Sequence, residues 1–186
     1  MGEIIGFAGN FSSPSRTRQL IQTAVDQAGS RAGRGGRVFD LGDLGASLGM
    51  GRRIDDLAPD ARDLVDSLIA SDALVVGSPV YKGSYTGLFK HLFDLIDPEA
   101  LRGKPVLLTA TGGGHRHVLV VEHQLRPLFA LFEAAVVPVG VYAASADLEG
   151  GGVAPDVALR LQTAVGQLIG LLARHQKTER PASSAA

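Results

Sequence analysis

The sequence has no cysteine, almost no net charge and no apolar run long enough to cross a membrane. Without cysteine there can be no disulfide, thiolate metal site or thiol nucleophile, and this composition fits a reducing cytoplasm. A net charge of −1 removes the electrostatic case for nucleic acid or an anionic membrane as partner, because both bind basic surfaces. A membrane span needs about 20 apolar residues, and no charged, then apolar, leader opens the sequence. We therefore expect a soluble cytoplasmic protein that binds small molecules or other proteins.

Several familiar site signatures are also missing. The first strand-like run is followed by neither GxxxxGK[ST] nor GxGxxG, which disfavours a nucleoside triphosphatase and a Rossmann dinucleotide site. A receiver-type phosphoacceptor needs acidic residues at the ends of the first and third strands, where this chain has Asn10 and Ser78. No acidic cluster accompanies His115, His117 and His123 in the sequence, so we expect no metal site.

What the sequence does have is a regular alternation of short apolar runs and longer helical patterns. Its 186 residues, with 45% hydrophobic content, suffice for one α/β domain with a sizeable core. The alternation predicts a doubly wound, five-stranded parallel sheet of order 2-1-3-4-5, covered by helices on both faces. We expect this single domain over residues 1–176 and a disordered tail over residues 177–186.

The expected strands are residues 3–8, 37–41, 73–77, 106–110 and 135–142, and Pro138 argues that the last is an edge strand. The expected helices are residues 15–30, 59–71, 85–96, 115–133 and 155–176. The helix expected over residues 115–133 is apolar on nearly every side, which indicates burial all round. One side can meet the sheet, so we expect another to meet a second subunit, with His123 and Arg126 in that interface.

The first loop (residues 9–18) reads as a phosphate cradle. Ser15 stands at the N-cap position of the helix that follows, where free backbone N–H groups and the helix dipole favour an anion. The guanidinium groups of Arg16 and Arg18 add positive charge. Hydroxyl groups come from Ser12, Ser13, Ser15 and Thr17. The alternative is an ordinary capped helix with a solvated polar turn.

Two further strands end in loops suited to a flat ligand. In the second loop (residues 78–85), Pro79 withdraws a donor, Tyr81 and Tyr85 can supply an aromatic wall, and Lys82 adds a cation. In the glycine loop (residues 111–115), three successive glycines let bare N–H groups approach a ring. Plain turns are the alternative for both loops. In the predicted sheet, however, the three strand ends are neighbours at the switch point, so the loops converge on one site.

Taken together, four sequence motifs in this chain resemble those of a known protein family. AGNFSSPSRTRQL, GSPVYKGSYTGLFKHLFDLI, LRGKPVLLTATGGGHRH and EHQLRPLF resemble the NAD(P)H-dependent FMN reductases of the flavodoxin-like fold, in particular their alkanesulfonate and methanesulfonate branch. The resemblance covers roughly residues 3–142. It implies that the first loop holds the FMN phosphate, and that the other two loops border the isoalloxazine. The implied residues are Asn10, Ser12, Ser15, Arg16, Thr17, Pro79, Val80, Tyr81, Lys82, Thr111, Gly112, Gly113 and Gly114.

The chain departs from the family pattern at two places. Many relatives have a serine, and an arginine two positions on, where this chain has Asn10 and Ser12, which implies a lower phosphate affinity here. In related alkanesulfonate reductases an inserted aromatic residue of the fourth helix lies near flavin at the tetramer interface. His123 occupies the similar position here, which resembles the methanesulfonate side of the branch.

The resemblance implies an enzyme in which NAD(P)H reduces FMN by hydride transfer, and reduced flavin leaves for a monooxygenase that releases sulfite from sulfonates. Hydride transfer between stacked rings is mainly positioning, so we expect no indispensable general acid or base. We expect a homodimer or homotetramer. The alternatives are a quinone or azo reductase with bound FMN, a flavodoxin-type electron carrier, and a flavin-free interaction domain.

Overall fold

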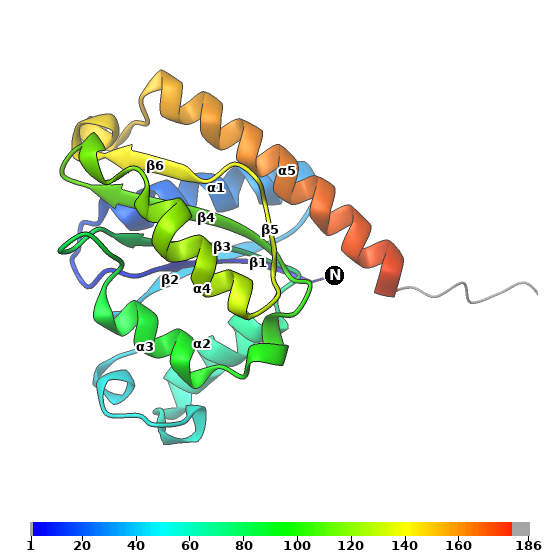
Figure 1. Ribbon diagram of the computed structural model, residues 1–186. Coiled ribbons are helices and arrows are strands. Elements are labelled where there is room, and N and C mark those ends of the chain that lie inside the picture. Colours follow the sequence, from blue (N-terminus) through cyan, green and yellow to red (C-terminus); the bar gives the residue numbers. More distant parts are fainter. Residues whose placement is uncertain (1, 180–186) are drawn as a thin grey trace, which may run out of the picture.

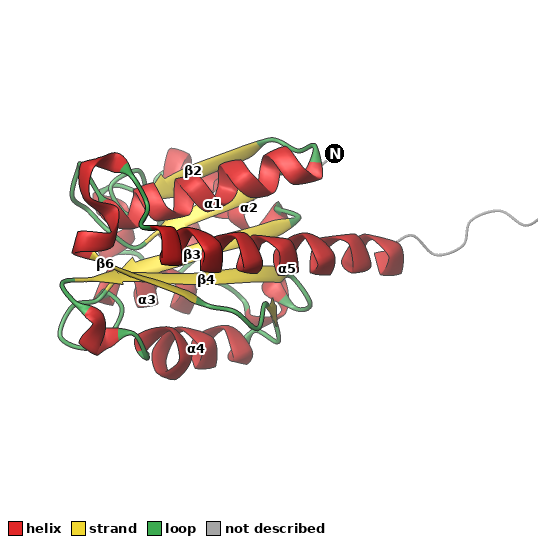
Figure 2. Cartoon of the chain, turned by 90° about the horizontal axis from the view of Figure 1, so that it is seen from above, coloured by secondary structure: helices red, strands yellow, loops and turns green. Residues whose placement is uncertain are grey.

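A parallel sheet forms the centre of the molecule, with helices packed on both faces (Figures 1 and 2). In this computed structural model, which describes residues 2–179, neighbouring strands follow the order β2-β1-β3-β4-β5, and β6 also pairs with β4. The strands are β1 (Ile4–Ala8), β2 (Gly36–Asp40), β3 (Ala73–Pro79), β4 (Pro105–Gly112), β5 (Ala135–Val136) and β6 (Val141–Ala144). The predicted α/β class and the order 2-1-3-4-5 are confirmed.

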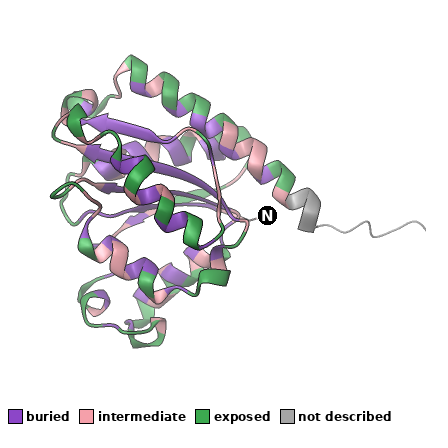
Figure 3. Ribbon diagram, viewed as in Figure 1, coloured by how far each residue is buried: buried purple, intermediate pink, exposed green. Residues whose placement is uncertain are grey.

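Five α-helices cover the described part of the sheet, and the strand pattern decides which face each covers. The helices are α1 (Arg16–Ala32), α2 (Pro59–Ala70), α3 (Gly87–Leu95), α4 (Arg126–Leu131) and α5 (Pro155–Glu179). Successive side chains of a strand point to opposite faces. Ile4 and Ala8 of β1 accordingly pack with α1 and α5, whereas Ile5 and Phe7 pack with α2, α3 and α4. The inner strands β1, β3 and β4 and the strand β6 are almost wholly buried (Figure 3), whereas β2 and β5 at the edges are partly exposed.

The prediction of one continuous strand over residues 135–142 is wrong. It is divided into β5 and β6, and both pair in parallel with β4. Pro138 has no N–H and cannot donate to a ladder, so the chain leaves the sheet at this residue. The Arg126 guanidinium fixes the segment between β5 and β6 by donating hydrogen bonds of 3.0 Å to the carbonyls of Val137 and Pro138. Arg126 therefore bridges the break between β5 and β6.

The continuous helix expected over residues 115–133 is also wrong. A 3₁₀ turn (His115–His117) and a π turn (Val121–Leu125) precede the short helix α4. Pro127 supplies the reason, since it lacks the N–H that a regular α-helix would aim at the carbonyl of His123. A π turn is rare and occurs mostly as a single turn within a helix, as it does here. Val118, Leu119 and Leu131 remain exposed on the outer side.

The remaining boundaries lie close to the predicted ones. At the C-terminus, residues 177–179 belong to α5, and residues 180–186 of the expected tail lie outside the described part of the chain. In residues 2–179, no helix has both the length and the apolar character needed to cross a membrane.

Candidate functional site

An open pocket lies at the C-terminal ends of β1, β3 and β4, where the first, second and glycine loops meet. This central pocket has a volume of about 200 Å³. Its lining residues are Asn10, Ser12, Pro14, Ser15, Arg16, Thr17, Pro79, Val80, Tyr81, Thr111, Gly112, Gly113 and Ser145. The structure thus brings together the residues predicted for the site in all three loops, except Lys82 and Gly114, which lie outside the lining.

The first loop enters α1 through a capped N-terminus, as predicted. Ser15 has extended backbone angles (φ −123°, ψ 123°), and its hydroxyl accepts a hydrogen bond of 3.2 Å from the N–H of Arg18. This geometry satisfies one of the free N–H groups at the helix start. Arg16 is exposed, lines the central pocket and forms no ion pair with any described residue. Its charge is available to an anion.

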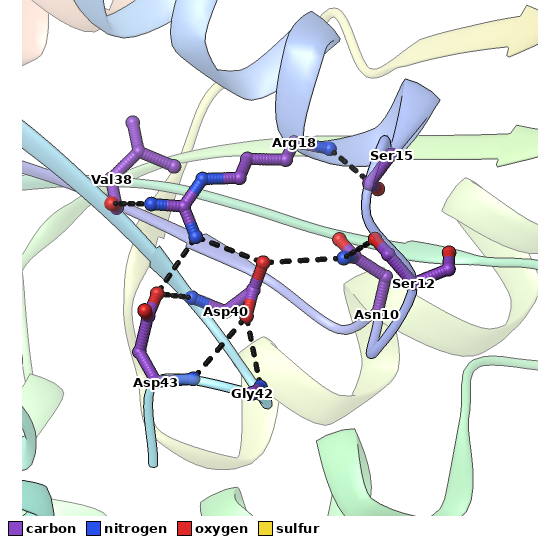
Figure 4. A network of polar contacts seen from close by, with 8 residues as sticks. All are labelled: Asn10, Ser12, Ser15, Arg18, Val38, Asp40, Gly42 and Asp43. Atoms are coloured by element: carbon purple, nitrogen blue, oxygen red, sulfur yellow. Dashed lines mark hydrogen bonds and ion pairs between the residues drawn. The ribbon is translucent and has the colours of Figure 1, made fainter. Parts of the chain in front are cut away.

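Arg18 corrects the sequence prediction, because its guanidinium points away from the central pocket. It donates to Asp40 at 2.8 Å, to Asp43 at 2.7 Å and to the carbonyl of Val38 at 2.8 Å (Figure 4). Burial opposes the charge, but the two carboxylates outweigh it and raise the pKa of Arg18 above its usual value. Arg18 therefore fastens α1 to the end of β2, and Arg16 carries the positive charge of the pocket.

Asn10 continues this network into the first loop (Figure 4). Its side-chain amide donates to the carbonyl of Ser12 at 3.2 Å and to Asp40 at 3.3 Å, and the residue is only 2% exposed. Its Oδ1 is buried without a hydrogen-bond partner among the described residues. Asn10 thus fixes the shape of the first loop, because its side-chain amide donates both of its hydrogen bonds to other residues of the protein.

Two threonines join the first loop to the glycine loop. The hydroxyls of Thr17 and Thr111 lie 2.6 Å apart and are buried. The carbonyl of Thr111 also accepts a 2.7 Å hydrogen bond from the N–H of Val80 in the second loop. Thr111 is therefore the point at which all three loops are connected.

The second loop folds back as a tight turn. The N–H of Tyr81 donates to the carbonyl of Ser84 at 2.9 Å, and the reverse bond is 3.2 Å long. Lys82 and Gly83 both have positive φ, 53° and 85°, as a two-residue hairpin turn of the primed type requires. This turn carries Lys82 outside the pocket lining and leaves Tyr81, which is 59% exposed, at the rim.

The glycine loop is held from behind by two residues that the sequence analysis did not single out. Tyr142 of β6 donates its hydroxyl to the carbonyl of Gly114 at 2.5 Å, and Ser145 donates to the carbonyl of Gly112 at 3.3 Å. A Cβ at Gly112 would lie 2.4 Å from the Tyr142 hydroxyl, so a larger residue there would displace that hydroxyl. Burial, with a smaller effect of the Asp147 charge, raises the pKa of Tyr142, so its hydroxyl stays protonated as a donor.

His123 lies away from the central pocket. It lines an outer groove on the π turn, together with Gly83, Arg116, His117, Leu119, Val120 and Gln124. A hydrogen bond of 3.0 Å from Ser84 to Gln124 connects the groove to the second loop. Within residues 2–179, no three His, Cys, Asp or Glu side chains are grouped so that they could hold a metal ion.

The pocket and fold can now be compared with known proteins. The family model described as NADPH-dependent FMN reductase matches residues 3–149. The chain belongs to this family. An FMN reductase (NADPH) of Pseudomonas aeruginosa strain PAO1 is 45% identical over 147 residues, which cover 79% of each chain. The NADH-dependent FMN reductase SfnE of Pseudomonas putida is 36% identical over 180 residues, or 96% of this chain and 97% of that one.

Solved structures agree with this assignment. The X-ray structure of an oxidoreductase from Corynebacterium diphtheriae matches with a TM-score of 0.80 at 36% identity, covering 93% of this chain and 98% of that one. The flavodoxin-like fold and the predicted family are therefore confirmed. As a member of the FMN reductase family, the protein is an NAD(P)H:FMN oxidoreductase, and FMN and a reduced nicotinamide are its reactants.

Proposed function

We propose that the central pocket is the flavin site, with the FMN phosphate at the first loop and the isoalloxazine between the second loop and the glycine loop. One observation supports this above all others. A hydroxyl-rich helix start with an arginine that no described carboxylate pairs, an apolar wall and a bare glycine backbone face the same pocket. These are the three chemistries that a phosphate, a flat ring and polar ring atoms require.

The residues present fit FMN. Ser12, Ser15 and Arg16 offer hydroxyl and guanidinium donors to a phosphate, while Pro79 and Val80 present an apolar surface. A Cβ at Gly113 would meet no atom within 4 Å, so the backbone there is open to a ligand. We include Asn10, Thr17, Thr111 and Gly114 as residues that shape these surfaces. Lys82 contributes charge only at the rim.

Bound FMN would supply the chemistry itself, as the acceptor of a hydride from the reduced nicotinamide. The chain's part is positioning, because the described lining of the central pocket contains no carboxylate, imidazole or amine that could act as a general acid or base. The glycine loop directs N–H groups at the ring, and Thr111 keeps that loop in register with the phosphate donors. Preorganised donors of this kind stabilise charge that develops on a bound ring.

We further propose that reduced flavin leaves the enzyme and supplies an FMNH₂-dependent monooxygenase in sulfonate sulfur assimilation, in the cytoplasm. The resemblance to the sulfonate branch supports this, as does the similarity to the reductase named SfnE. A homodimer or homotetramer fits the exposed Val118 and Leu119, of which Leu119 lines the same groove as His123.

The test is the oxidation of NADH and of NADPH by purified, flavin-stripped protein, with FMN varied from well below to well above the protein concentration. Many turnovers that saturate with added FMN are expected. Tight stoichiometric FMN binding, with turnover only when a quinone, azo dye or protein acceptor is added, would contradict flavin release. Absence of FMN binding would contradict the assignment of the pocket.

A further inference from the structure

Hydrogen-bond donors line the outer groove, the cavity on the π turn that contains His123. The groove has a volume of about 200 Å³, and its polar side chains are Arg116, His117, His123 and Gln124. Among the residues that the structure describes, no carboxylate lines it. Its volume lies below the range of about 300–1,000 Å³ typical of whole small-molecule ligands. The groove therefore suits a small charged group, and the FMN assigned to the central pocket does not account for it.

The guanidinium of Arg116 is oriented by its neighbour. Its Nε–H donates to Nε2 of His117 at 3.1 Å. The two terminal nitrogens of Arg116 form no ion pair or hydrogen bond with another described residue. These terminal groups make up the fork that binds two oxygens of a phosphate or sulfate at once. Because Nε2 of His117 accepts a hydrogen bond, the proton of the neutral ring lies on Nδ1, which is a further donor.

Gln124 is fixed so that its donor group stays free. Its Oε1 accepts a hydrogen bond of 3.0 Å from the Ser84 hydroxyl, and its Nε2 group makes no hydrogen bond with a described residue. The acid next to His123 in the chain, Glu122, does not neutralise the groove, since it is paired with Arg126 and lines a different cavity. The groove thus combines a guanidinium, an amide N–H₂ and imidazole N–H groups with no acceptor charge.

The groove and the central pocket share the second loop. Tyr81 of this loop lines the central pocket, and Gly83 lines the groove. The hydrogen bond from Ser84 to Gln124 connects the same loop to the π turn. Arg116 follows the glycine loop directly in the sequence. The groove is therefore adjacent to the place where a reduced nicotinamide reacts in the proposed function.

We propose that the outer groove is a binding site for a tetrahedral oxyanion, a phosphate or sulfate group held by Arg116, His117 and Gln124. Donors without a neighbouring carboxylate favour such an anion and disfavour a cation. Two sources supply this chemistry, namely a free inorganic oxyanion and the 2′-phosphate that NADPH carries and NADH lacks. The site itself does not depend on flavin, and only the second source rests on the proposed function.

The first experiment titrates inorganic phosphate and sulfate into the protein by isothermal titration calorimetry at constant ionic strength. The protein is saturated with FMN, so that the first loop is not free to bind the probe, and a flavin-free Arg16→Ala variant provides a second background. In each background, Arg116→Gln removes the charge and the fork at an exposed residue. Arg52→Gln is the matched control, because Arg52 is an exposed arginine outside the groove. Circular dichroism checks the folding of each variant.

We expect saturable binding of both anions with a Kd of about 1 mM or below. Arg116→Gln should raise this Kd about tenfold or more, because it removes a charge-assisted contact. Arg52→Gln should leave the Kd within about twofold. The inference is overturned if neither anion binds, or if the two arginine variants weaken binding equally.

Steady-state rates with FMN then identify the source of the anion. If the source is NADPH, Arg116→Gln should lower kcat/KM about tenfold for NADPH and leave it within about twofold for NADH, and inorganic phosphate should compete with NADPH alone. If the anion is free, the two coenzymes should respond equally. Either result supports the site, provided that Arg116→Gln has weakened anion binding. If FMN is neither bound nor reduced, the proposed function fails, and calorimetry in the Arg16→Ala background still decides this inference.

Discussion

The first loop and the glycine loop face the same pocket but are built in opposite ways. The first loop presents side chains, namely hydroxyls and the guanidinium of Arg16, and is braced by the ion pairs of Arg18 with Asp40 and Asp43. The glycine loop presents bare backbone, and side chains from behind, Tyr142 and Ser145, hold its carbonyls. In the proposed flavin site, one side of the pocket would thus recognise the charge of the phosphate, and the other would let the ring lie close to the backbone.

The largest expected effect is on flavin binding, and it tests whether the first loop, unlike the glycine loop, depends on the charge of the ligand. Replacing Arg16 by alanine removes a charge-assisted contact of about 1.5–3 kcal/mol, so the Kd for FMN should rise about 10- to 150-fold. Riboflavin has no phosphate, so its Kd in the Arg16→Ala variant should stay within about twofold of the wild-type value, as measured by fluorescence titration.

Arg18→Gln is the matched control. Because Arg18 is paired with Asp40 and Asp43, its loss should lower stability and leave the FMN Kd within about threefold. Equal losses in Arg16→Ala and Arg18→Gln would refute the division of roles.

The next effect concerns the bond that joins the loops. Thr17→Val leaves the buried hydroxyl of Thr111 without its partner, which should cost about 1–3 kcal/mol of unfolding free energy. Thr111→Val should cost a similar amount. The double variant should cost less than the sum, because both partners are then apolar. Denaturant titrations of the four proteins provide the cycle, and strict additivity would show that the two hydroxyls are not coupled.

A smaller effect is expected from behind the glycine loop. Tyr142→Phe loses one neutral hydrogen bond to the carbonyl of Gly114, worth about 0.5–1.5 kcal/mol. Since the loop borders the ring in the proposed flavin site, Kd should rise for FMN and riboflavin alike, by about two- to tenfold. Ser145→Ala, with its longer 3.3 Å bond, should have the weaker effect of the two. A rise in Kd for FMN without a rise for riboflavin would contradict this, because it would show that Tyr142 supports the phosphate and not the ring.

The smallest effect lies outside both loops. Hydrogen bonds from Arg126 lower the pKa of Glu122, although burial opposes this. A carboxyl with a lowered pKa stabilises the fold above its unfolded value of about 4.3, and the stabilisation is lost as pH falls through the folded pKa. Glu122→Gln should therefore cost less than about 1 kcal/mol at pH 7, because the pair is partly exposed. Unfolding at pH 7 and pH 3.5 checks this, and a larger cost at the lower pH would contradict it.

The sequence predicts features that depend on local pattern. Short apolar runs located β1, β3 and β4, and period-3.6 patterns located α1, α2, α3 and α5. The strand order brought the three loops together as expected. It did not predict features that depend on distant partners. The two acidic partners of Arg18, one at the end of β2 and one just beyond it, cannot be read from residues 9–18. Tyr142 looks like any strand residue until the fold places its hydroxyl at Gly114. The breaks at Pro127 and Pro138 had a visible signal, since both prolines interrupt regular patterns.

The distribution of aromatic residues has a practical consequence. The chain contains no tryptophan and only three tyrosines. Tyr81 lies at the rim of the central pocket, Tyr85 ends the second loop and packs on Phe89, and Tyr142 lies behind the glycine loop. Tyrosine emission of the protein therefore originates entirely around the proposed flavin site. The unmodified enzyme carries its own optical reporter, and energy transfer from tyrosine to a bound ring can follow the arrival and departure of flavin without a label.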